Sequence, residues 1–510
     1  MNKAVAILMI MLLAGAVNSA AAQDRKELEE LQSTTFELIN LLVDEGVLSR
    51  AKADLLIREA SKRADVAKQK AVEAKAADSK VVRVPYVPQT VRDQIRDEIK
   101  QDIVAEAKAG GWGNPGALPE WMDRISFEGD IRLRYQGDRF QKDNAPPFAF
   151  PAGQDISNTT EDRDRFAVRA RLGLNLKFSD WLTGGMRLTT GNTTTPVSTN
   201  QTLGNSFNKY SMVLDQAYVR ADPVEWLTIS GGRMPNPWFS TDLVWDEDIN
   251  FDGVAVTFKP RFTDTLNGFL TIGAFPLQEV SDSTTTLAKD KWLTGIQGGL
   301  SWALPHNSNF KFGVGIYNFQ NIEGIRNTGA TTFYDLTAPQ FRQKGNSLFD
   351  ITGLGTGALY GLAANFKELN LTAAYDIARF DPVHVVMTGD FVKNIGYDSA
   401  EISQRTGIAA PEPETKGYYA RVLVGMPRLR GRGDWQTHLG YKYLERDAVV
   451  DAYTDSDFHL GGTNAKGFIL GGSYGVGNNS WMSLRWMSST QISGAPLSID
   501  VMQLDFNARF

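Results

Sequence analysis

Polar and apolar residues alternate along several segments of this sequence, and that period of two is its most restrictive feature. From Ile125 to Gln136 the odd positions carry apolar residues or glycine and the even positions carry polar or charged residues; the segment from Arg165 to Phe178 has a similar pattern. A helix cannot separate two faces at this period, whereas successive side chains of a strand point to opposite sides. The pattern therefore predicts strands with one apolar and one polar face.

Such strands fit a soluble sandwich, with its apolar faces inside, or a membrane barrel, with its apolar faces against lipid. Many segments are longer than the roughly five or six residues typical of soluble strands. Short connections such as "SDW" and "NNS" take turns with long ones such as 138–162 and 321–355. Since this asymmetry is typical of outer-membrane barrels, we predict an all-β transmembrane antiparallel β-barrel over residues 125–510, in contact with outer-membrane lipid.

The chain ends in "SIDVMQLDFNARF", an alternating strand with a terminal aromatic residue. This ending resembles the assembly signal of bacterial outer-membrane proteins. Phe506 and Phe510 are therefore predicted to form the signal, and the barrel assembly machinery is a predicted partner.

Strand number follows from parity. Seventeen runs between Ile125 and Phe510 are plausible strands, but an odd number is excluded if the helical N-terminus and Phe510 both lie on the periplasmic side. Merging two neighbouring runs into one long strand, Ala358 to Phe380, gives about sixteen. Eighteen is the alternative, if the long connection 321–355 contains a hairpin.

The region before the barrel has a different composition. Residues 1–22 combine Lys3, an apolar run and Ala20-Ala21-Ala22, which predicts a cleaved signal peptide. Residues 23–110 have helical patterning and predict a periplasmic helical region, either an αα-hairpin that buries its own leucines or a short coiled coil that joins subunits. Residues 111–124 are the predicted linker to the barrel.

Composition excludes several classes of function. The chain has no Cys, only four scattered His and a net charge of −6, so thiol and imidazole sites are disfavoured and no nucleic-acid partner is expected. Asp and Asn residues at alternate positions from Asp246 to Asp252 imitate the start of a calcium loop, but Phe251 and Thr257 stand where that pattern needs Gly and Glu. We expect no metal, no cofactor and no catalytic residues.

Two segments carry a family resemblance. "VRVPYVPQTVRDQIRDEIKQDIVAEAKAGGWGNPGALPEWMDRISFEGDIRLRYQ" and "GGRMPNPWFSTDLVWDEDINFDGVAVTF" resemble the putative porin family of Gram-negative outer membranes, from the signal peptide to the last residue. The resemblance implies a pore-forming barrel with a periplasmic helical extension. It does not identify a solute.

Charged residues suggest how the pore selects solutes. The polar faces of the first two strands carry five arginines, a basic wall that would favour anions, with pairing to Glu128 and Asp130 as the alternative. The connection between the fifth and sixth strands is acidic. In sixteen-stranded general porins the loop at this place folds inward, and by this similarity we predict a constriction loop that faces these arginines. The pore-lining residues are Arg132, Arg134, Arg165, Arg169 and Arg171, and the constriction-loop residues are Asp242, Asp246, Glu247 and Asp248.

The sequence thus predicts an outer-membrane porin for passive diffusion of small hydrophilic solutes or ions. By similarity to sixteen-stranded porins we expect a homotrimer. The alternative is a structural tether whose helical N-terminus binds peptidoglycan or a periplasmic partner. An outer-membrane enzyme is disfavoured, because no Ser/His/Asp grouping is apparent.

Overall fold

The computed structural model describes residues 124–510 except 282, 330, 354–356 and 410. The predicted signal peptide, helical region and nearly all of the linker lie outside the described residues. Within the described range, no helix has the length and apolarity needed to span a membrane.

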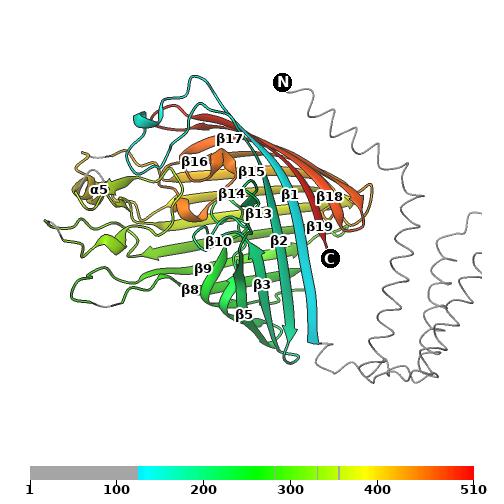
Figure 1. The fold of residues 1–510 in the computed structure, drawn as a ribbon. Helices are drawn as coiled ribbons and strands as arrows, with labels where there is room; N and C mark the ends of the chain where they lie inside the picture. Colours follow the sequence, from blue (N-terminus) through cyan, green and yellow to red (C-terminus); the bar gives the residue numbers. More distant parts are fainter. Residues whose placement is uncertain (1–123, 282, 330, 354–356, 410) are drawn as a thin grey trace, which may run out of the picture. The chain divides into compact units, whose positions relative to one another are not determined.

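The main sheet closes into a barrel because its first strand pairs with its last. β1 (Ile125–Phe140) runs antiparallel to β19 (Ser498–Arg509), and seventeen strands belong to this sheet. One of them, β4 (Gln201–Thr202), has only two residues, which leaves the sixteen long strands that the sequence predicts (Figure 1). The other long strands are β2 (Arg163–Lys177), β3 (Leu182–Thr190), β5 (Met212–Val224), β6 (Leu227–Pro235), β7 (Asn250–Phe258), β8 (Leu266–Gln278), β9 (Lys291–Ala303), β10 (Asn309–Gln320), β13 (Lys367–Phe380), β14 (Val383–Asn394), β15 (Lys416–Gly425), β16 (Trp435–Leu444), β17 (Ala465–Gly477) and β18 (Ser480–Gln491).

The prediction of one strand from Ala358 to Phe380 is wrong. Residues 360–362 form β12 (Tyr360–Leu362), which pairs with β11 (Leu348–Asp350) in a separate two-stranded sheet, and the wall strand β13 begins only at Lys367. A Cβ on Gly361 would lie 2.6 Å from the Cα of Gly324, so this segment packs backbone to backbone against the beginning of the same connection, 321–366, instead of continuing the wall. The long connection does contain a strand pair, but that pair lies outside the wall and does not give eighteen strands.

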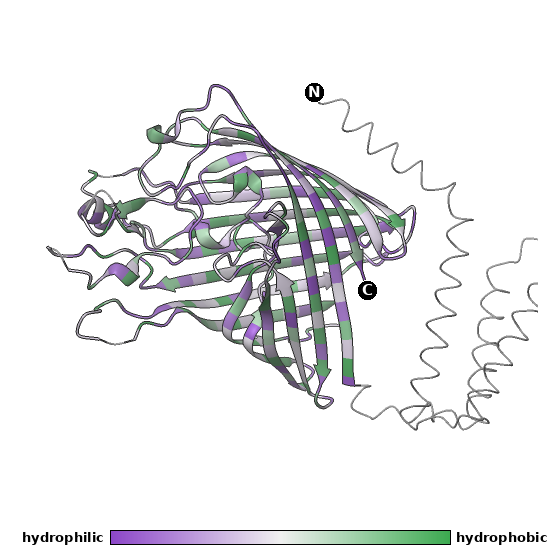
Figure 2. Ribbon diagram, viewed as in Figure 1, coloured by the Kyte–Doolittle hydropathy of each residue, from purple (hydrophilic) through white to green (hydrophobic). Residues whose placement is uncertain are grey.

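The two faces of the wall have the polarity expected in a membrane. On β1, Phe127 is 65% exposed and Leu133 is 51% exposed, whereas Arg134 and Gln136 are each 4% exposed. The described strands alternate in hydropathy along their length (Figure 2). Apolar side chains thus face outward and polar ones face the lumen, the reverse of a soluble sandwich.

Part of the interior is filled by aromatic side chains from loops and strands. Trp245, in the connection after β6, is 3% exposed. Its ring centroid lies 5.0 Å from that of Phe251 and 5.3 Å from that of Tyr317. Edge-to-face pairs of this kind add to the stability gained from burial, so the connection is held against the inner side of the wall.

Gly253 gives a test of the wall's geometry. Its φ is +141°, and a Cβ there would lie 2.2 Å from the carbonyl oxygen of Ala274 on β8. We expect Gly253→Ala to destabilise the barrel by about 1 to 3 kcal/mol and to lower its thermal midpoint in detergent. Gly389→Ala is the matched control, because a Cβ at Gly389 would have no neighbour within 4 Å. Equal midpoints for the two variants would contradict the expectation.

Candidate functional site

The connection between β6 and β7, residues 236–249, crosses the inside of the barrel and is called the inner loop below. The backbone N–H of Phe239 donates to Gln297 Oε1 on β9 at 2.8 Å, and Thr241 Oγ1 donates to Asp390 Oδ2 on β14 at 2.7 Å. Near its other end, Asp248 Oδ2 accepts from Thr199 Oγ1 at 2.9 Å. Gln297 and Asp390 are buried polar side chains on the lumen face of two separate parts of the wall, so a loop that bonds to both lies in the lumen. β6 and β7 are the fifth and sixth long strands, so this is the connection that the sequence predicts to fold inward.

A second connection, residues 445–464 between β16 and β17, packs against the inner loop and is called the second loop. The backbone N–H of Asp246 donates to the Tyr453 carbonyl at 2.9 Å, and the N–H of Ser456 donates to Asp246 Oδ2 at 2.9 Å. Burial raises the pKa of the Asp246 carboxyl well above its ordinary value. The sequence analysis missed the second loop, although its closely spaced aspartates, "DAVVDAYTDSD", were a readable signal.

A buried lysine joins both loops to the wall. Lys442 on β16 is 1% exposed, and its Nζ lies 2.6 Å from Asp455 Oδ2 of the second loop and 3.5 Å from Asp242 Oδ2 of the inner loop. Burial alone would raise the pKa of Asp455, but the charge and hydrogen bond of Lys442, together with the charge of Arg485, leave that pKa below its ordinary value. A buried charge is tolerated only when it is paired in this way, so the arrangement fixes the position of the two loops.

Two of the predicted pore-lining arginines pair with a carboxylate on the neighbouring strand. Arg169 and Arg171 lie 3.0 Å and 2.6 Å from Asp130 on β1. They also lie 3.7 Å and 3.5 Å from Asp248 Oδ1 of the inner loop. The predicted arginines and one predicted constriction-loop carboxylate thus meet across the lumen, and the alternative of pairing with Asp130 is present as well.

The other three arginines also have carboxylate neighbours. Arg134 lies 2.8 Å from Asp505 and 3.2 Å from Asp457, and Arg165 lies 3.8 Å from Asp138. For Arg132 the nearest carboxylate is the exposed Glu247, 3.9 Å away, and its buried Nε has no hydrogen-bond partner. Arg132 is therefore the least neutralised of the five.

One cavity of 410 Å³ lies between the loops and the wall, at the level of the middle of the strands; we call it the constriction cavity. Cations from the wall and carboxylates from the loops face it together. Arg421 on β15 forms no hydrogen bond or ion pair within residues 124–510 as described. The charged residues around this cavity are Arg132, Arg421, Arg485, Asp242, Asp246, Glu247, Asp248, Asp455 and Asp457.

The sequence analysis missed Arg421 and Arg485, although the signal was present. Both lie in alternating segments, "KGYYARVLVG" and "SWMSLRWMS", at positions whose neighbours are apolar. The same period-two rule that placed the five predicted arginines in the lumen would have placed these two there.

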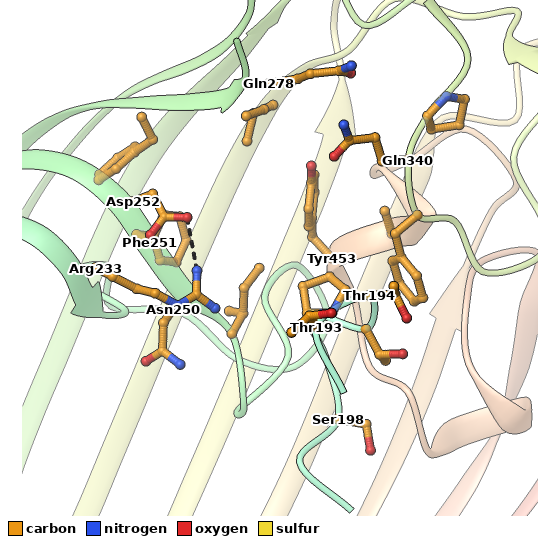
Figure 3. A pocket seen from close by; sticks show the side chains of 18 of the residues that line it. Thr193, Thr194, Ser198, Arg233, Asn250, Phe251, Asp252, Gln278, Gln340 and Tyr453 are labelled. Atoms are coloured by element: carbon orange, nitrogen blue, oxygen red, sulfur yellow. Dashed lines mark hydrogen bonds and ion pairs between the residues drawn. The ribbon is translucent and has the colours of Figure 1, made fainter. Parts of the chain in front are cut away.

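A second and larger cavity of 690 Å³, which we call the outer cavity, lies near the ends of the strands that carry the long loops. Figure 3 shows Arg233, Asp252, Gln278, Gln340 and Tyr453 around the same space, with an ion pair between Arg233 and Asp252. It shares no lining residue with the constriction cavity. In the described part of the chain, no group of three or more His, Cys, Asp or Glu side chains is arranged to hold a metal ion.

Asp457 should hold the second loop in place. It accepts from Arg134 Nη1 at 3.2 Å and from Gln503 Nε2 at 2.9 Å, and it also pairs with Arg485. Asp457→Asn removes the charge from a partly buried network, at a cost of about 3 kcal/mol. We expect a higher and noisier single-channel conductance in planar bilayers. Asp264→Asn, at a side chain that is 97% exposed, should leave the conductance unchanged, and equal traces for the two variants would refute this role.

Asp451 should make the packing of the second loop depend on pH. Both of its carboxyl oxygens are buried without a partner, and burial raises its pKa to about 7. Since the folded-state pKa exceeds the unfolded value, the stability linked to its protonation is present at low pH and is lost as the pH rises through about 7. Relative to the wild type, Asp451→Asn should be more stable at about pH 9 than at about pH 5. Thermal unfolding at both values measures this, and a constant difference would contradict it.

Comparison with solved structures finds outer-membrane proteins at low sequence identity. Pseudomonas putida OprB at high pH is 10% identical, with a TM-score of 0.45, over 78% of this chain and 97% of that one. The outer-membrane channel DcaP of Acinetobacter baumannii is 12% identical, with a TM-score of 0.40, over 76% and 97%. Salmonella typhi OmpF is 11% identical, with a TM-score of 0.39, over 76% and 97%.

Sequence comparison gives the family. No curated protein sequence matches the chain, but the model of the family described as Putative porin matches residues 32–510, which include the whole barrel and both loops. The resemblance read from the sequence is confirmed. The chain belongs to the Putative porin family and is a porin, a channel-forming β-barrel of the outer membrane.

Proposed function

We propose that small hydrophilic solutes diffuse passively through this barrel and that the constriction cavity is the narrowest part of their path. The observation that carries the proposal is the meeting of both charge signs around one cavity of 410 Å³. A polar lumen holds water, and loops that fold into it reduce its open cross-section. This proposal requires no cofactor, covalent chemistry or energy coupling.

Charge selection is proposed to depend on few residues. The carboxylates beside Arg134, Arg169 and Arg171 neutralise much of the basic wall at close range. Arg421, whose side chain forms no hydrogen bond or ion pair in the described part of the chain, and Arg132, with a carboxylate only at 3.9 Å, retain the most attraction for anions. Glu247 is 75% exposed at its side chain and offers the opposite charge. An ion in the cavity would then experience a field across the pore.

Oligomeric state and the N-terminal region are further parts of the proposal. We expect a homotrimer, with the N-terminal helices in the periplasm. The support for both is similarity to sixteen-stranded porins and the composition of residues 23–110. Light scattering of the detergent-solubilised protein would count the subunits, and a monomer would refute the trimer.

The charge test uses Arg132→Gln with Arg421→Gln. Nearby carboxylates neutralise these two arginines least, so the double variant should shift the anion/cation permeability ratio in planar bilayers towards cations. Glu247→Gln should shift the same ratio towards anions. Arg261→Gln is the matched control, because Arg261 is 69% exposed and lies in a turn beside Asp264. Unchanged ratios would refute the charge mechanism, and a wild-type protein without conductance would refute the pore itself and favour a tether.

A further inference from the structure

The outer cavity arises where two neighbouring wall strands separate. β7 and β8 pair from Val254 with Ala274 to Phe258 with Leu270, and not beyond Val254 towards the long loops. Gly253 has a φ of +141°, which bends β7, and Pro276 on β8 has no N–H to donate to a neighbouring strand. The cavity of 690 Å³ opens along this separation. Its volume is within the range of roughly 300 to 1,000 Å³ that is usual for small-molecule sites.

Charged side chains around the outer cavity already have partners within the protein. Arg233 Nη1 lies 2.9 Å from Asp252 Oδ2, and Lys291 Nζ donates to the carbonyls of Thr337 and Ala338 at 3.3 Å and 3.0 Å. Asp215 pairs with an arginine at 2.6 Å. A charged solute that entered the cavity would lose part of its hydration without gaining a free opposite charge, so its binding would be unfavourable.

One further carboxyl group belongs to the lining. Asp451 is 1% exposed and its carboxyl oxygens are buried. Burial raises its pKa to about 7, so the neutral form is favoured below that pH. This group does not supply a fixed negative charge for a cation.

Uncharged polar groups, in contrast, are free. Within the described residues, the side chains of Thr193, Gln278 and Gln340 and the hydroxyl of Tyr453 form no hydrogen bond. These side chains surround one space (Figure 3). Each amide offers donors and an acceptor, and each hydroxyl can do both. A solute hydroxyl, which also donates and accepts, is the group that satisfies them best.

Apolar side chains complete the lining. Phe251, Phe275, Leu277 and Phe341 border the same cavity. They offer contact to the carbon skeleton of a solute, while the polar groups fix its orientation. The cavity therefore combines neutral hydrogen-bonding groups with an apolar surface.

We infer that the outer cavity is a binding site for uncharged polyhydroxylated solutes, which occupy it before they reach the constriction cavity. This inference deepens the proposed function, since it names the class of solute that the porin admits. The binding site depends on residues of the outer cavity and the pore proposal on residues of the constriction cavity, so experiments can refute one without the other.

The test compares three probes with nearly the same carbon skeleton: glucose, which is neutral, gluconate, which is an anion, and glucosamine, which is a cation. Added to the wild-type channel in planar bilayers, glucose should reduce the ion current in a saturating manner, and the two charged probes should not saturate. Gln278→Ala with Gln340→Ala should weaken the apparent glucose affinity about tenfold, because the solute loses its hydrogen bonds to both amide side chains. Gln436→Ala is the matched control, because Gln436 lies on β16 and does not line the outer cavity. It should leave the apparent glucose affinity unchanged.

Saturation-transfer NMR of the detergent-solubilised protein measures the same binding without any current. Contact between glucose and the wild type, reduced in the double variant, would support the site whether or not the channel conducts. Equal binding of gluconate or glucosamine, no binding of glucose, or an undiminished signal in the double variant would overturn it. If glucose does not bind but ion current and selectivity are normal, the binding site is refuted and the proposed pore is not.

Discussion

The pairing of β1 with β19 is the constraint on which the rest of the structure depends. In lipid each backbone N–H and C=O must bond within the protein, and a sheet achieves this only when it has no free edge. The register that joins Asp130 to Arg509 and Phe140 to Ile499 closes the wall over most of β1. Once the wall is closed, apolar side chains have only lipid to face, and polar side chains from opposite strands share one lumen.

That shared lumen explains why so many charges are buried in pairs. Loops that fold into it bring carboxylates close to arginines and lysines, and a buried charge without a counter-charge would cost several kcal/mol. Lys442, on the wall, pairs with a carboxylate of each loop. Arg134, also on the wall, pairs with one carboxylate of the second loop and one of β19. The same contacts that stabilise the loops divide the interior into the constriction cavity and the outer cavity. The ion pairs that stabilise the loops therefore also shape the space that is left open inside the barrel.

Much of the fold could be read from the sequence, because alternation is a local property. It placed the five predicted arginines on the inner face and, together with parity, gave sixteen strands, whereas the connection that enters the lumen was predicted from similarity to sixteen-stranded porins. It failed between Ala358 and Phe380, where two runs with strand-like composition belong to different sheets. Alternation indicates that a segment is extended but not which segment it pairs with, and the close approach of Gly361 to Gly324 is a tertiary contact.

The sequence by itself determined which residues face lipid and which face water, since the side-chain period of a strand is fixed by backbone geometry. Only the tertiary structure decided which charges meet. Arg134 bonds to two carboxylates far along the chain, Asp457 at a separation of 323 positions and Asp505 at a separation of 371. The side chain of Arg421 forms no hydrogen bond or ion pair among the described residues. Such outcomes depend on where the wall closes and how two loops fold into it, and neither is encoded in any local pattern.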